Sequence, residues 1–145
     1  MDYEDIKNMA EKDSKIDGTE LDIESIKIPQ LHNKYLRMLQ DEKLVLRSLL
    51  SKKSLLQRLK WEYYTGKMSK EELEHHEWEP FQLNVLKKDL DIYLESDSDM
   101  NVMKDRIAYQ EAKLQFLEEV IKELNSRPWK IKNAIEWRKF TSGGF

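Results

Sequence analysis

The chain has 145 residues, of which 37% are charged and 39% hydrophobic, and its formal net charge is −3. This length suggests one domain with a small core. The absence of cysteine excludes a disulfide framework, a thiolate metal site and thiol catalysis. Because the first residues are acidic and no apolar run approaches about 20 residues, we predict neither a signal peptide nor a membrane span. We therefore expect a soluble cytoplasmic protein.

Four glycines and three prolines leave few positions for turns, which favours long helices over a many-stranded sheet. Residues 1–18 form an acidic segment that suits a short helix, with carboxylates in its first turn. A break is expected at Asp17-Gly18, and a new helix at Thr19. Pro29 either kinks this helix or opens the next one. The expected class is all-α.

A strong amphipathic helix is predicted over residues 31–66, with Gly66 as its left-handed cap. Its apolar residues alternate steps of four and three, which defines a heptad seam interrupted by Glu42 and Lys52. A helix of roughly 50 Å is too long for one small core, so we expect an oligomer to cover part of it. The apolar seam residues are Leu31, Tyr35, Met38, Val45, Leu49, Leu56, Leu59 and Tyr63.

We predict a single helical domain over residues 1–140. Its second half has a less uniform pattern than its first. A capping box at Ser69 predicts a short helix, but the conformation of most of 67–97 stays open. A second heptad seam predicts a long helix over residues 98–125, preceded by a cap signal. Proline at 128 is expected to start a separate basic helix over 128–140. Residues 141–145 are predicted to form a flexible tail.

Sites for catalysis, metals or cofactors are not predicted. The Glu72-x-x-His75 step occurs once, whereas di-iron bundles need two such steps and further carboxylates. The acidic run at 97–101 lacks the glycine and the bidentate glutamate of a calcium loop. Thr65-Gly66-Lys67 lacks the first glycine and the final hydroxyl of a P-loop. No nucleophile–base pair is evident, so the chain is predicted not to be an enzyme.

The stretch from Lys43 to Lys70 is basic within an acidic protein, with Glu62 as its single acid. On a helical wheel its cations other than the seam residue Lys52 fall mainly on two faces outside the seam. Cations with aromatic rings suit single-stranded nucleic acid, because phosphates bind cations and bases stack on rings. A solvated face with aromatic residues in an oligomer contact explains the same pattern equally well. The first cationic face holds Lys43, Arg47, Arg58 and Trp61, and the second holds Lys53, Lys60, Tyr64 and Lys67.

Within this stretch, a basic residue, a spacer, a second basic residue and Tyr-Tyr-x-Gly-Lys follow one another. These residues are Arg58, Lys60, Tyr63, Tyr64, Gly66 and Lys67. The segment resembles the UvsY-type recombination mediators of T4-like bacteriophages, and the resemblance extends over most of the chain. It departs from the family pattern at Pro29, in the connector after Lys67, and in the order arginine then lysine.

The resemblance implies an all-α protein that forms a homo-oligomeric ring of six or seven subunits in the infected host cell. It implies binding to single-stranded DNA, to the phage recombinase and to the phage single-strand-binding protein. It also implies that Arg58 and Lys60 contact DNA and that the C-terminal part drives self-association. The candidate DNA-binding residues are Arg58, Lys60, Trp61, Tyr64, Lys67, Arg47, Lys53 and Lys43. The candidate oligomerisation residues are Leu114, Leu117, Ile121, Leu124, Trp129 and Trp137.

Two other functions are consistent with the composition. One is a non-catalytic helical scaffold or adaptor, an oligomer whose cations serve solubility and partner contacts only. The other is a regulator that binds double-stranded DNA or RNA, which is weaker because the sequence has no helix-turn-helix, zinc or RNA-recognition signature.

Overall fold

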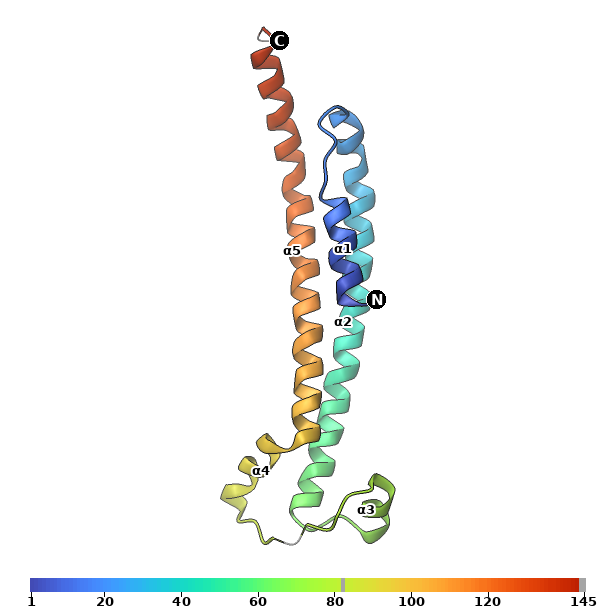
Figure 1. The fold of residues 1–145 in the computed structure, drawn as a ribbon, viewed down its shortest axis with the longest axis vertical. Coiled ribbons are helices and arrows are strands. Elements are labelled where there is room, and N and C mark those ends of the chain that lie inside the picture. The colour runs from blue at the N-terminus through green and yellow to red at the C-terminus, as the bar shows by residue number, and fades with distance from the viewer. Residues whose placement is uncertain (82, 144–145) are drawn as a thin grey trace. The chain divides into compact units, whose positions relative to one another are not determined.

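The computed structural model describes residues 1–81 and 83–143. Within these ranges the chain is helical and has no strand, which confirms the predicted all-α class (Figure 1). No helix of the described ranges combines the length and the apolar character that crossing a bilayer requires. The elements are α1 (Tyr3–Asp13), α2 (Leu21–Tyr64), α3 (Lys70–His76), η1 (Lys87–Asp89, a 3-10 helix), α4 (Leu90–Ser96) and α5 (Ser98–Thr141).

The chain divides into two compact units, where the sequence suggested one domain. The terminal unit contains Met1–Lys43 and Ala112–Phe145, and the central unit contains Leu44–Glu111. The helices α2 and α5 each contribute one half to each unit.

In the terminal unit, α1 packs on the first half of α2 and the second half of α5. Its core contains side chains with no exposed surface from all three helices: Ile6, Tyr35, Leu117 and Leu124. The seam interruption at Glu42 is explained by a buried ion pair, because Lys113 Nζ lies 3.4 Å from Glu42 Oε2. The amino group of Met1 adds a second cation at 3.5 Å from Glu42 Oε1. Burying a carboxylate in a seam requires such partners.

Both long helices pass through a proline, and the sequence-based boundaries at these residues are wrong. Pro29 lies inside α2, so it does not start a new helix, and α2 extends back to Leu21. Pro128 lies inside α5, so residues 98–125 and 128–140 belong to one helix. A proline removes one backbone hydrogen bond, whereas the packing of the surrounding turns acts along the whole helix.

The predicted tail also differs from the structure. Thr141 is still helical, Ser142 and Gly143 form a turn, and residues 144 and 145 lie outside the described part.

In the central unit, the predicted helix ends are confirmed in atomic detail. Gly66 has φ +74°, and the amide of Lys67 donates to the carbonyl of Glu62 at 2.9 Å, which makes the C-terminal cap of α2 a Schellman motif. Ser69 accepts a hydrogen bond from the amide of Glu72 and caps α3. Asp97 accepts a hydrogen bond from the amide of Met100 at 2.9 Å and caps α5.

Candidate nucleic-acid interface

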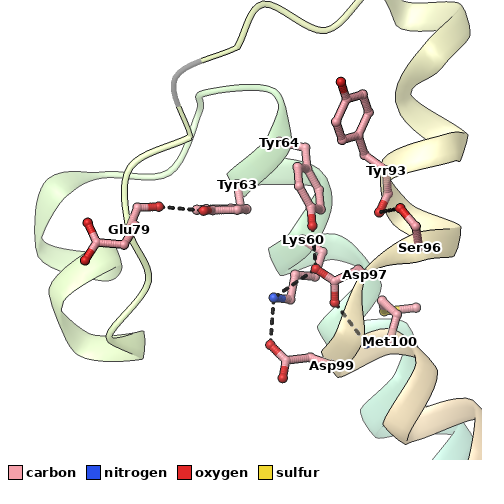
Figure 2. A network of polar contacts seen from close by, with 9 residues as sticks. All are labelled: Lys60, Tyr63, Tyr64, Glu79, Tyr93, Ser96, Asp97, Asp99 and Met100. Carbon is pink, nitrogen blue, oxygen red and sulfur yellow. Dashed lines mark hydrogen bonds and ion pairs between the residues drawn. The ribbon is translucent and has the colours of Figure 1, made fainter.

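The basic motif at the end of α2 contains a buried cation, Lys60. Its ammonium lies 2.7 Å from Asp99 Oδ2 and 3.1 Å from Asp97 Oδ2 (Figure 2). The ring of Trp78 covers the ammonium, with its centroid 3.9 Å from Nζ. Only 5% of the Lys60 side chain is exposed, compared with 53% of the Asp99 side chain. The Lys60 ammonium is therefore bound by side chains of the same chain and is shielded from solvent.

Tyr64 belongs to the same network. Its hydroxyl donates to Asp97 Oδ2 at 2.6 Å. Burial alone raises the pKa of Asp97, but hydrogen bonds from Tyr64, from the Met100 amide and from Lys60 outweigh burial and bring the pKa below its usual value. Burial and the hydrogen bond to Asp97 raise the pKa of Tyr64. At neutral pH Asp97 is therefore ionised and Tyr64 is neutral, so the phenol donates its hydrogen bond to a carboxylate.

Aromatic rings around this network hold the connector against α2. Phe81 lies edge-on to Tyr64, with ring centroids 4.9 Å apart and an interplanar angle of 88°. Tyr63 contacts the ring of Trp78 at 5.4 Å, and its hydroxyl donates to the carbonyl of Glu79. Tyr93 of α4 contacts Phe81 at 5.5 Å. Edge-to-face geometry of this kind is favoured by the ring quadrupoles, so the cluster defines positions for both tyrosines.

The first cationic face is accessible. Arg58 has a side chain that is 67% exposed, with Glu62 4.0 Å away as an ion-pair partner. Arg47 of the central unit is exposed, and Lys43 is exposed in the terminal unit. Trp61 is 38% exposed, and the ammonium of Lys67 lies 4.3 Å from its ring centroid. Cations and an aromatic surface are thus available to solvent on this side of α2.

The second cationic face is not the exposed surface that the helical wheel predicted. Lys60 is buried, Tyr64 and Lys53 are half-buried, and only Lys67 is exposed. A helical wheel treats α2 as packed along one seam, whereas contacts from the connector and the start of α5 cover this flank as well. Partners such as Asp99, which is 39 residues away, could not be paired with Lys60 from the sequence.

The candidate oligomerisation residues fall into two groups. Leu114, Leu117 and Leu124 are buried in the core of the terminal unit, with Ile121 half-buried beside them. Trp129 and Trp137 are 66% and 65% exposed, and Trp137 stacks on the exposed ring of Phe140. The leucines therefore serve the fold of the chain, whereas both tryptophans are exposed to solvent.

Nowhere in the described residues do three or more histidine or acidic side chains meet in a way that could hold a metal ion. The polar groups of the Lys60 network satisfy one another. What the central unit offers is a solvent-facing set of cations and rings, beside a rigid internal network.

The fold is that of a known class of helical recombination proteins. Two crystal structures of the bacteriophage T4 recombination mediator protein UvsY match with TM-scores of 0.85 and 0.84. The first is 22% identical over 97% of this chain and 99% of that one, and the second is 24% identical over 99% of both. Comparison with curated proteins by sequence gives no match.

The family follows from the sequence itself. The family model described as "Recombination, repair and ssDNA binding protein UvsY" matches residues 9–144. The chain belongs to the UvsY family, and the resemblance seen in the basic motif at 58–67 is confirmed.

Proposed function

We propose that this protein is a recombination mediator that binds single-stranded DNA and helps load a phage recombinase onto DNA covered by single-strand-binding protein. The observation that carries this proposal is the family match over residues 9–144. In this proposal the protein is not an enzyme, and it acts as a homo-oligomeric ring of six or seven subunits. Its partners are the DNA strand, the recombinase and the single-strand-binding protein.

The exposed cations support the DNA-binding part of this proposal. Arg47, Arg58 and Lys67 are exposed in a protein whose net charge is −3. These side chains therefore attract phosphate locally, although the negative net charge of the chain repels it. A single set of such contacts is weak, but an oligomer presents the set several times to one strand, and linked contacts raise the overall affinity.

Lys60 has a different role in this proposal. Because its ammonium is buried between Asp97 and Asp99, we assign it to holding the end of α2 against the start of α5. Direct phosphate contact is assigned to Arg58, whose side chain points into solvent. Substitution of either residue is expected to reduce DNA binding, but for different physical reasons.

The test compares the two residues. Fluorescence anisotropy with a labelled oligo-dT should show binding at 50 mM salt that weakens as salt rises, with a slope of about −0.7 per phosphate contact. Arg58→Ala should weaken binding several-fold and leave urea unfolding unchanged within about 0.5 kcal/mol. Lys60→Ala should lower the free energy of unfolding by about 3 kcal/mol, because Asp97 stays buried without its cation.

Three outcomes would contradict the proposed function or its residue assignments. An oligomer that binds no single-stranded oligonucleotide at 50 mM salt would favour the helical scaffold, and preference for a duplex competitor would favour the double-strand regulator. If Lys60→Ala leaves stability unchanged but weakens DNA binding, Lys60 contacts phosphate directly and the structural assignment is wrong. The loading step itself is checked by whether the protein shortens the lag of recombinase assembly on covered single-stranded DNA.

A further inference from the structure

A groove in the central unit lies between the end of α2 and the segment that precedes α4. Its volume is about 470 Å³, within the usual range of pockets that bind small organic ligands. Residues of the basic motif form one side, including Trp61, Tyr64 and Lys67. The other side is formed by Phe81, Asn84 and Lys87, which lie outside the motif. The groove is therefore larger than the surface that the sequence pattern indicated.

The charge of the groove is distinctive for this chain. Lys67 and Lys87 line it, and its lining residues include no aspartate or glutamate. By contrast, four carboxylate residues line a groove of similar size in the terminal unit: Glu11, Asp13, Glu119 and Glu123. In a protein of net charge −3, a hollow whose charged lining residues are both lysines favours an anionic ligand.

The aromatic wall of the groove is held in place before any ligand arrives. Asp97 accepts the hydrogen bond of the Tyr64 hydroxyl at 2.6 Å, and Phe81 lies edge-on to the Tyr64 ring at 4.9 Å. Trp61 stays partly exposed at the groove, with the Lys67 ammonium over its ring. At Gly66, nothing lies within 4 Å of where a side chain would begin, so this edge of the groove is open.

We propose that this groove binds one nucleotide of single-stranded DNA, which rests on the DNA binding proposed above. The base stacks on the aromatic wall formed by Trp61, Tyr64 and Phe81, and the phosphate lies between Lys67 and Lys87. The amide of Asn84 supplies both a donor and an acceptor, so it can hydrogen-bond to the edge of any base. Cations that meet the backbone and rings on which bases stack are the groups by which proteins bind a single strand without sequence preference.

The chain offers a matched pair of lysines for the test. Lys87 and Lys88 are neighbours in η1 and both are exposed, but only Lys87 lines the groove. Lys87→Ala should weaken oligo-dT binding by about three- to tenfold and reduce the salt slope by about 0.7 for each Lys87 that contacts the strand. Lys88→Ala should stay within twofold of the parent protein. Equal effects of the two substitutions would overturn the proposal.

A second arm asks whether the groove holds a base. For the parent protein, an oligonucleotide with abasic sites should bind at least about fivefold more weakly than oligo-dT of equal length. In Trp61→Ala that difference should shrink towards onefold, because the stacking surface is gone. If the difference persists in Trp61→Ala, the base is read elsewhere and the nucleotide groove is wrong. If the parent protein binds neither oligonucleotide, the proposed function itself fails.

Discussion

At the scale of single residues, each unit contains the same trio of a carboxylate, a tyrosine and a lysine. In the terminal unit Asp13 accepts hydrogen bonds from Tyr35 and Lys34, both at 2.6 Å. In the central unit Asp97 accepts them from Tyr64 and Lys60. In each trio the carboxylate is met by one cation and one neutral donor, so it is not placed against a helix without partners. Each trio ties two distant segments of the chain.

From the two trios we expect the stability of the fold to fall both in acid and in alkali. Despite burial, hydrogen bonds keep the pKa values of Asp13 and Asp97 low, so their contribution is present above the unfolded value of about 3.9 and is lost as pH falls. Burial raises the pKa values of Tyr35 and Tyr64, so their contribution is present below about 10 and is lost as pH rises. We expect stability to be highest between about pH 5 and pH 9.

Tyr64→Phe isolates one trio in this experiment. It should lower the free energy of unfolding by about 1–2 kcal/mol near pH 7, since the hydrogen bond to a carboxylate is lost. Its losses in acid and in alkali should both be shallower than those of the parent protein, since Asp97 loses a partner and no phenol remains to ionise. Urea unfolding from pH 3 to pH 11 at fixed protein concentration measures this. Superimposable profile shapes would show that the pair does not control stability.

At the scale of elements, the ends of helices follow local rules and their flanks do not. The caps at Gly66, Ser69 and Asp97 involve residues within a few positions of one another, so the sequence indicated all three. The flank of α2 near Lys60 depends on a segment that lies far along the chain. At Pro128 the local signal gives the wrong boundary. Proline indicates the start of a new helix, but the packing of the turns on both sides keeps α5 continuous.

That override predicts a gain in stability on Pro128→Ala. Alanine restores the amide that can donate to the carbonyl four residues earlier and removes the clash of the proline ring, which should add about 1–3 kcal/mol to the free energy of unfolding. Urea unfolding gives the energy, and slower amide exchange at residues 124–132 locates it. Pro80 lies outside the helices, so Pro80→Ala serves as the control and should change stability by less than about 0.5 kcal/mol. A less stable Pro128→Ala would show that α5 requires a weakened turn there.

At the scale of the whole molecule, the chain leaves large aromatic side chains in solvent. Trp129, Trp137 and Phe140 are 66%, 65% and 72% exposed, respectively, near the end of α5. Exposed aromatic surface, here including the stacked rings of Trp137 and Phe140, is typical of a contact with another chain. Basic side chains, including Arg138 and Lys139, accompany it. We propose that these tryptophans form part of the contact between subunits of the ring.

Assembly and folding can be separated with two substitutions. Trp137→Ser should shift sedimentation towards smaller species and leave helicity unchanged, since the indole contributes little to the subunit core. Leu117→Ala removes a fully buried side chain and should cost about 2–5 kcal/mol of subunit stability. Sedimentation velocity and urea unfolding are measured at one protein concentration, because assembly raises apparent stability. Unchanged assembly in a Trp129→Ser, Trp137→Ser double variant would place the contact elsewhere.

The sequence by itself determined the all-α class, the two seams, the caps and the family, because periodicity, capping and a short motif are local patterns. It also identified Arg58 and Trp61 as accessible residues, since both lie opposite the seam. Only the tertiary structure decided that Lys60 is buried, that Pro128 continues a helix, and that Lys87 faces the groove beside Trp61. These three features depend on contacts between segments far apart in the chain, and the pattern of one helix carries no information about its distant neighbours.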